Sequence, residues 1–226
     1  MQSKDRTYQV VAIVALIIGV FALSIGFAAF STTLTIKSAA EVTPAQEPLN
    51  VKFSTSNTSY VAGTVNGVDA GTVTGATADV ASLADTTIQN INAKFTKPGQ
   101  SVTYSFNAYN GSSFDAYLTG ITFKNVDGSS PAATKVCTAK AGTNPASNGV
   151  DEACADITIS VSVGTHTATG SETSTEIGTH KLEAGQGETI VVTITYLNGT
   201  GHGHEADGDF TVSFGDIALS YSTVNS

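Results

Sequence analysis

The hydrophobic and polar positions of this chain follow two different patterns, which meet near residue 30. From Val10 to Phe30 the chain carries no charge, and only glycine and serine residues interrupt its apolar run. As a helix this run would be about 30 Å long, which is enough to cross a bilayer. The pattern therefore predicts an N-terminal hydrophobic helix.

Beyond this run, apolar and polar side chains alternate with period two, which is typical of β-strands that bury one face. Glycine- and asparagine-rich turns separate the alternating segments, and we find no convincing amphipathic helical pattern. Tryptophan is absent and only 13% of the residues are charged, which suits an all-β protein. We therefore expect one all-β domain, a jelly roll or β-sandwich, after the hydrophobic helix. The alternating segments are residues 30–36, 49–53, 102–109, 157–163, 190–196 and 210–221.

The last of these segments changes parity in the middle. Phe210 and Phe214 lie on one parity, whereas Ile217 and Tyr221 lie on the other. The Gly215-Asp216 pair stands between them. We expect a β-bulge at this pair, which would let one long strand keep a single face on the core.

The N-terminal apolar run has two interpretations. Two basic residues precede it, and Gly26 and Ala28 occupy the −3 and −1 positions of a cut between Ala28 and Ala29, as in a signal peptide. Its length also suits a retained membrane anchor. Both interpretations insert residues 10–30 into a membrane, at least transiently, and place residues 31–226 outside the cytoplasm, extracellular or at the cell surface. The predicted parts are residues 1–28 (signal peptide or anchor), 29–48 (N-terminal strand and linker) and 49–226 (β-domain).

The charge of the exported part argues against one class of partner. Removing residues 1–28 leaves 8 basic and 18 acidic side chains of the 10 and 19 in the whole chain. Such an excess of acidic residues makes nucleic acid an unsuitable partner.

The chain has only two cysteines, Cys137 and Cys154. In an exported protein such a pair indicates a disulfide, which here would close a loop of about 17 residues. Two free thiols are the alternative. Because the cysteines lack Cys-x-x-Cys spacing, we expect a structural role and not a redox one.

Several segments resemble the TasA/camelysin family of exported proteins of Gram-positive bacteria. The junction Ala28-Ala29-Phe30-Ser31 is similar to the site at which a dedicated signal peptidase cuts members of that family. Gln100 stands where the family carries an acidic residue, the two cysteines are additional, and residues 128–179 match little. Further similarity lies at residues 49–53, at Pro98-Gly99-Gln100 with the strand that follows, at Asn110-Gly111-Ser112, at residues 116–118 and at the closing segment 210–221.

The resemblance implies a jelly-roll subunit of an extracellular fibre in a biofilm matrix or on the bacterial cell envelope. In such a fibre, built by donor-strand exchange, the N-terminal strand of one copy completes a sheet of the next. The implied partners are further copies of the chain and the signal peptidase; neither enzymatic activity nor a cofactor is expected. The donor strand would present Phe30, Thr32, Leu34 and Ile36 on one face.

The residues themselves support an N-terminal strand that needs a partner. An alternating strand with an apolar face and unpaired backbone groups is not stable alone in water. Cleavage from the membrane would free it to pair with a neighbour, and head-to-tail pairing gives an open filament. In the alternative arrangement the same strand folds back onto its own sheet. The proline-containing connector 38–48 permits either.

An enzymatic function has weaker support. The sequence contains no His-Glu-x-x-His helix and no Gly-x-Ser-x-Gly elbow. Camelysin relatives have been regarded as metalloproteases, so His202, His204 and Glu205 are weak candidates for metal ligands. The flanking glycines argue against a preorganised site, and a solvated polar loop is the simpler interpretation.

A membrane-anchored β-sandwich that serves in adhesion or ligand binding is the main alternative function. Exposed aromatic side chains would then line a binding face. Asn57, Asn110 and Asn198 each begin an Asn-x-Ser/Thr sequence, which marks a turn in most bacterial chains and a glycan site in others. The candidate aromatic residues are Tyr60, Tyr109, Phe114 and Tyr117.

Overall fold

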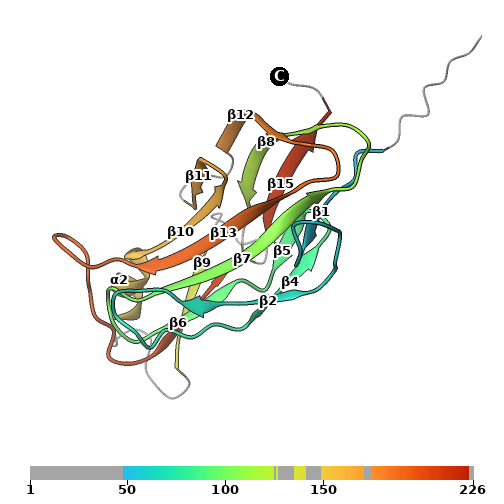
Figure 1. Cartoon of the computed structure of the whole chain (residues 1–226). Coiled ribbons are helices and arrows are strands. Elements are labelled where there is room, and N and C mark those ends of the chain that lie inside the picture. The colour runs from blue at the N-terminus through green and yellow to red at the C-terminus, as the bar shows by residue number, and fades with distance from the viewer. Residues whose placement is uncertain (1–47, 125, 127–134, 141–148, 171–174, 224–226) are drawn as a thin grey trace, which may run out of the picture. The chain divides into compact units, whose positions relative to one another are not determined.

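The computed structural model describes residues 48–124, 126, 135–140, 149–170 and 175–223, without the side chains of 175–179. These residues belong to one compact unit and form three sheets whose strand pairings are all antiparallel. The fold is therefore all-β, as the alternation predicts. In Figure 1, the long strands β7, β13 and β10 run side by side across the front, with β8, β15 and β9 behind them. The strands are β1 (Val51–Ser54), β2 (Thr64–Asn66), β3 (Val68–Asp69), β4 (Val80–Ala84), β5 (Thr87–Gln89), β6 (Asn92–Phe95), β7 (Ser101–Asn110), β8 (Ala116–Phe123), β9 (Lys135–Ala139), β10 (Ile157–Val163), β11 (His166–Thr169), β12 (Thr175–Leu182), β13 (Gly187–Tyr196), β14 (Phe210–Phe214) and β15 (Ile217–Ser222), and the helix is α2 (Val150–Ala155).

Sheet A has the strand order β1-β7-β13-β10-β11, with β3 also paired to β7. Its centre is the pairing of β7 with β13, which runs in unbroken register from Ser101 opposite Thr195 to Tyr109 opposite Gly187. Each strand alternates between buried apolar and more exposed polar residues. Because that alternation fixes which face is buried, it also fixes the register of neighbouring strands.

Sheet B has the order β12-β8-β15-β5-β4-β2, and sheet C has the order β6-β14-β9. The segment 210–221 therefore supplies β14 to sheet C and β15 to sheet B. The prediction of one long strand with a β-bulge at Gly215-Asp216 is wrong, because the chain changes sheets at this pair. The change of parity is real, since it turns both apolar sets towards one core.

The core joins the buried faces of all three sheets. Tyr196 of sheet A packs edge-on against Phe210 of sheet C, with ring centroids 5.5 Å apart, and Phe95 lies against both rings. Phe53 and Phe106 form a second edge-on pair at 5.2 Å. Aromatic pairs of this kind contribute about 0.5–1.5 kcal/mol beyond the area that they bury.

Gln100 holds the turn that leads into β7. Its side chain is fully buried, and its Oε1 accepts hydrogen bonds from the amides of Thr96 (2.7 Å) and Lys97 (3.1 Å). Its Nε2 donates to the carbonyl of Thr74 at 3.0 Å. An acidic residue has no such donor, so the amide at this position suits the second contact.

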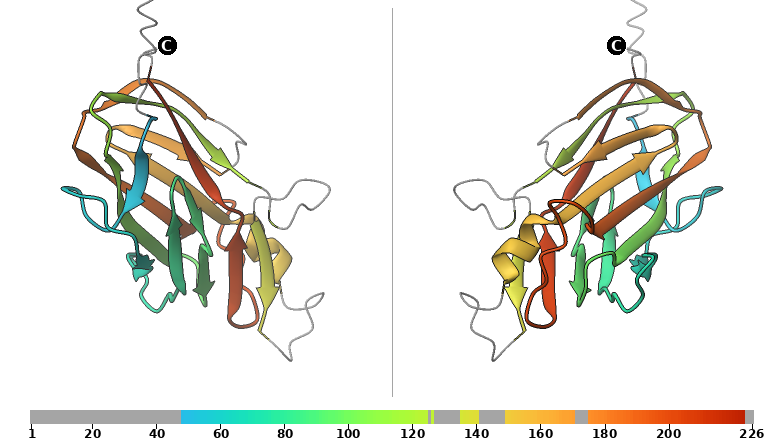
Figure 2. Two further views of the ribbon diagram at one scale, coloured as in Figure 1. Left: turned by 90° about the vertical axis from the view of Figure 1, so that its right-hand side faces the viewer. Right: turned by 90° about the vertical axis from the view of Figure 1, so that its left-hand side faces the viewer.

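Cys137 of β9 and Cys154 of α2 form a disulfide with a Cα–Cα distance of 5.9 Å. The expected pairing is therefore confirmed. The short helix was not predicted, and the disulfide ties it to the edge strand of sheet C. The side views in Figure 2 show α2 beside β9 at the end of the domain where β14 also lies.

We expect that replacing both cysteines by serine lowers the free energy of unfolding by about 3 kcal/mol, the chain-entropy value for a loop of this size. Urea unfolding of the double variant measures the change. Wild type kept in reductant is the matched control and should lose a similar amount. Equal stability of the variant and the oxidised wild type would contradict a stabilising role.

The predicted N-terminal elements lie outside the described residues. Within the described ranges, from residue 48 onward, no helix is long and apolar enough to cross a membrane. The predicted site residues that lie outside the described residues are the cleavage pair Ala28 and Ala29 and the donor-strand residues Phe30, Thr32, Leu34 and Ile36.

Candidate functional site

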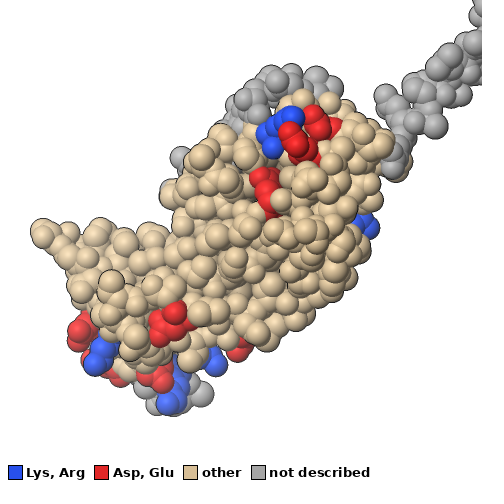
Figure 3. Space-filling view, in the orientation of Figure 1, with Lys and Arg blue, Asp and Glu red and all other residues tan. Residues whose placement is uncertain are grey.

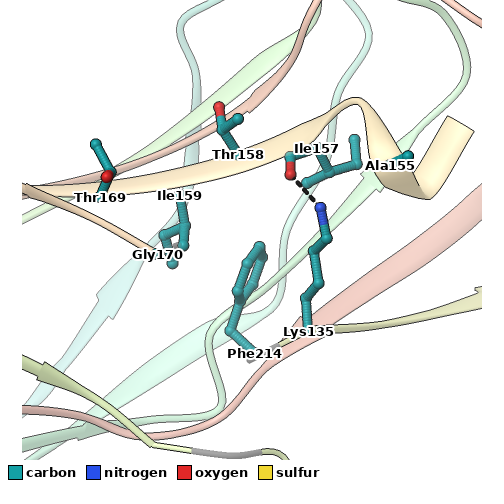
Figure 4. A pocket seen from close by; sticks show the side chains of 8 residues that line it. All are labelled: Lys135, Ala155, Ile157, Thr158, Ile159, Thr169, Gly170 and Phe214. Atoms are coloured by element: carbon teal, nitrogen blue, oxygen red, sulfur yellow. Dashed lines mark hydrogen bonds between the residues drawn. The ribbon is translucent and has the colours of Figure 1, made fainter. Parts of the chain in front are cut away.

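A cavity of about 520 Å³ lies where the edge of sheet A meets sheet C (Figure 4). We call it the edge cavity. Ile157, Ile159 and Phe214 are buried and give it an apolar wall, whereas Thr158 and Thr169 are exposed, so the cavity opens to the surface on their side. Its lining residues are Lys135, Ala155, Ile157, Thr158, Ile159, Thr169, Gly170 and Phe214.

The edge cavity lies beside a part of β10 that β11 does not reach. β11 pairs with residues 160–163 of β10, and the Gly170 amide then donates to the Ile159 carbonyl at 2.7 Å. Ile157 has the same parity as Ile159, so its backbone groups point to the same edge. Its carbonyl accepts a hydrogen bond from Nζ of Lys135 (Figure 4). A lysine side chain therefore stands where a neighbouring strand would donate an amide.

Lys135 is the first residue of β9 and lies opposite Phe214 of β14. Burial lowers the pKa of its ammonium group, and the nearby carboxylate of Asp156 acts in the opposite direction. Lysines at sheet edges commonly prevent unspecific pairing with other chains. We therefore interpret Lys135 as a polar cap on the Ile157 carbonyl.

An extended segment lying beside β10 in the edge cavity would meet two different surfaces. Because side chains alternate along a strand, every second one would face Ile157, Ile159 and Phe214. The others would lie on the side of Thr158 and Thr169. The cavity thus fits a segment that alternates apolar with hydroxyl-bearing residues.

Asp156 fixes the start of β10, directly before the edge cavity. Its side chain is only 4% exposed and joins β10 to the loop that follows β13. Oδ2 accepts hydrogen bonds from the amides of Gly203 (2.7 Å) and His204 (2.9 Å). Nδ1 of His202 lies 2.9 Å from Oδ1, and Nδ1 of His204 lies 2.8 Å from Oδ2. We call this set the Asp156 cluster.

The Asp156 cluster sets the electrostatics at this end of the domain. Burial alone would raise the pKa of Asp156, but the hydrogen bonds from His202, Gly203 and His204 outweigh it and hold that pKa well below its usual range. Tyr196 donates to the carbonyl of His204, and burial raises the pKa of Tyr196 to about 12. We call the loop after β13 that contains His202 and His204 the histidine loop. The ionised Asp156 side chain and the neutral Tyr196 phenol thus hold this loop against the core.

The three weak metal candidates lie in this loop. His202 and His204 direct Nδ1 to Asp156, while Glu205 is exposed. Among the described residues, no group of three or more histidine, cysteine, aspartate and glutamate side chains has an arrangement that could hold a metal ion. Asp156 was not among the sequence candidates, because its partners are 46 to 48 positions away.

The other polar candidates are dispersed. Asn110 is fully buried, and its Nδ2 donates to the carbonyls of Phe114 (2.9 Å) and Leu182 (3.1 Å). The Asn110 side chain therefore stabilises the turn that follows β7. Asn57 and Asn198 are exposed. Of the four candidate aromatic residues, Tyr60 is exposed beneath the Lys52 ammonium group, and Tyr109, Phe114 and Tyr117 are half-buried.

A second polar cluster joins sheets A and B. Glu188 of β13 accepts a hydrogen bond from the Tyr221 hydroxyl at 3.1 Å and also contacts Nε2 of His180. The ring of His166 lies edge-on to His180, with centroids 5.0 Å apart. Burial, followed by the charge of Glu188, raises the pKa of Tyr221. The cluster therefore braces the two sheets with a neutral tyrosine and a partly buried carboxylate.

Comparison of the chain with protein-family models, with curated proteins and with solved structures found no match in any of the three.

Proposed function

We propose that this chain is an exported structural subunit of an extracellular fibre, in a biofilm matrix or on the cell surface, which assembles head to tail by donor-strand exchange after signal-peptide cleavage. The proposal includes a jelly-roll arrangement of the sheets. The observation that carries it is the edge cavity: a place beside β10 where an apolar wall and a hydroxyl-bearing wall flank an edge that β11 does not cover.

The N-terminal segment has the matching pattern. Phe30, Leu34 and Ile36 share one parity, and Ser31, Thr33 and Thr35 share the other. Placed beside β10 of a second copy, the first set would face the apolar wall and the second would continue the hydroxyl-rich face of sheet A. In this arrangement, a backbone amide of the donor strand replaces Lys135 at the Ile157 carbonyl.

The apolar donor-strand residues Phe30, Leu34 and Ile36 are the anchors of the proposed contact. The expected binding free energies suit an assembly that depends on each of them. Burying one large apolar side chain contributes about 1.5–3 kcal/mol, so the three anchors together contribute on the order of 5–9 kcal/mol. Association costs about 4–15 kcal/mol in lost translational and rotational freedom. Because β11 and Gly170 already cover residues 159–163 of β10, backbone pairing with the donor strand is limited to the stretch around Ile157 and adds little. Loss of a single anchor should therefore be enough to stop assembly at ordinary concentrations.

The walls of the edge cavity are held in place before any donor arrives. The disulfide fastens α2 to β9, and the Asp156 cluster fastens the first residues of β10 to the loop after β13. A preorganised acceptor loses less conformational entropy on binding.

A matched pair of substitutions in the donor strand tests the proposal. We expect Leu34→Asp to raise the critical concentration for fibre formation at least 100-fold, because it places a carboxylate against the apolar wall. Thr33→Asp adds the same charge on the opposite face and should change it less than tenfold. Electron microscopy and sedimentation of assembled material over a concentration series measure both. Equal effects of the two substitutions would contradict a strand that docks with one defined face.

A further inference from the structure

The outer face of sheet A is a broad surface built almost entirely of small uncharged side chains. One row across the strands is Thr103, Thr193, Ser160 and Thr169, each paired with the next in register. These positions alternate with the buried core residues and are half or fully exposed. The neighbouring rows hold Ser105, Val191, Ser162 and Thr167 on one side and Thr195, Thr158 and the buried Ser101 on the other. We call these three rows the hydroxyl face.

The hydroxyl face carries no charged residue, although the chain has a net charge of −9. Figure 3 shows lysine, aspartate and glutamate side chains gathered towards the two ends of the domain, with an uncharged expanse over β7, β13 and β10 between them. Surfaces designed for solubility carry charged side chains at about a quarter to a third of their positions, whereas 13% of this chain's residues are charged. High strand propensity explains threonine here, but it does not explain the absence of lysine and glutamate from three successive rows.

We propose that the hydroxyl face packs against the same face of a second copy of this chain. Two acidic copies repel each other wherever their carboxylates meet, and this face brings none together. Hydroxyl groups both donate and accept hydrogen bonds, so two such faces can satisfy each other when water leaves. Small side chains also let the two sheets approach to about 10 Å, the usual separation of packed sheets.

The size of the face fits a weak contact that is repeated. β7, β13, β10 and β11 contain 10, 10, 7 and 4 residues. At a rise of about 3.4 Å and a strand spacing of about 4.8 Å, the three rows of the hydroxyl face cover only part of these strands, about 360 Å² on each copy or about 700 Å² for the pair. This is below the roughly 1,000 Å² of a specific stable interface, so a single contact is weak. If the proposed fibre forms, the contact recurs at every subunit and joins fibres side by side through multivalency.

The test captures the contact with a photoreactive side chain. The full-length chain with p-benzoylphenylalanine in place of Ser105 is irradiated in the cells that produce it. We expect a covalent dimer of about twice the mass of the mature chain, with the adduct on β7, β13 or β10 of the second copy. Adding either Thr193→Glu or Thr193→Lys should reduce the dimer at least tenfold, because a charge of either sign would be buried without a partner.

Matched controls separate this contact from the donor strand and from net charge. Thr58→Glu and Thr58→Lys, on an exposed loop, should leave the dimer unchanged. The dimer should persist, more weakly, in the chain without residues 30–36, so loss of fibres and loss of this contact are distinguishable. The proposal is overturned if no dimer forms, if both Thr193 substitutions leave its yield unchanged, or if the adduct is a neutral polysaccharide.

Discussion

Deletion of residues 30–36 is expected to abolish fibre formation and leave a folded, soluble domain that associates only through the weak hydroxyl-face contact. The described core residues and the two disulfide cysteines all come after residue 48 in the sequence, so we expect the domain to keep its sheets and its disulfide. What is lost is the strand that would fill the edge cavity of the next copy. Electron microscopy, size-exclusion chromatography and circular dichroism of the exported product measure the two parts of the expectation.

A mixing experiment makes the deletion more informative. The shortened chain keeps the edge cavity but has no donor strand, so it should add to a growing fibre and then stop it. Fibres assembled from wild type with an increasing share of the deletion variant should shorten in proportion to that share. Replacing residues 30–36 by a glycine-serine segment of equal length is the control for spacing and should behave like the deletion. Fibres of normal length from the deletion variant would refute donor-strand exchange.

The second large effect is expected at Asp156. Replacing it by asparagine removes the charge and turns one of the two acceptor oxygens into an NH2 donor, so the hydrogen bonds of His202, Gly203 and His204 can no longer all be made. Loss of a buried, hydrogen-bonded carboxylate costs about 2–4 kcal/mol in the free energy of unfolding. Urea unfolding should show this decrease. Asp151→Asn, at an exposed position of α2, is the matched control and should change stability by less than about 0.5 kcal/mol.

The same carboxylate predicts a pH dependence. The pKa of Asp156 is lower in the folded state than its usual value of about 3.9. Above that usual value its stabilising contribution is complete, because both states are ionised. As the pH falls further, the unfolded state takes up the proton first, and the contribution is lost progressively down to the folded pKa. Between pH 5 and pH 2 the wild type should therefore lose more stability than Asp156→Asn; parallel curves would contradict this role.

The sequence predicts the sheets better than the way in which they meet. Strict alternation located β7, β10 and β13 to within a few residues, since a half-buried strand must place apolar side chains at every second position. The change of parity at Gly215-Asp216 was visible too. The change of parity alone did not distinguish a β-bulge from a change of sheet. Both move the following side chains to the opposite face, and only the partner strands differ. The six residues of α2 are too few to show a helical period.

The candidate site was less accessible from the sequence. The edge cavity combines β9, β10, β11 and β14, and its two walls arise from pairings that no local pattern specifies. Asp156 has an ordinary local context, and only the folded chain brings the histidine loop to it. The N-terminal strand was predicted from its own alternation and its donor role from the family resemblance, and the cavity that we assign to it became visible only in the structure.

One measurement tests the central claim most directly. Fibres are assembled from equal amounts of unlabelled and ¹⁵N-labelled chain, each carrying a photoreactive leucine analogue at Leu34, and are irradiated and digested for mass spectrometry. We expect cross-links that join position 34 of one isotopic form to β10 or β14 of the other. Cross-links from position 34 that stay within a single isotopic form would show a strand folded onto its own domain and would contradict donor-strand exchange.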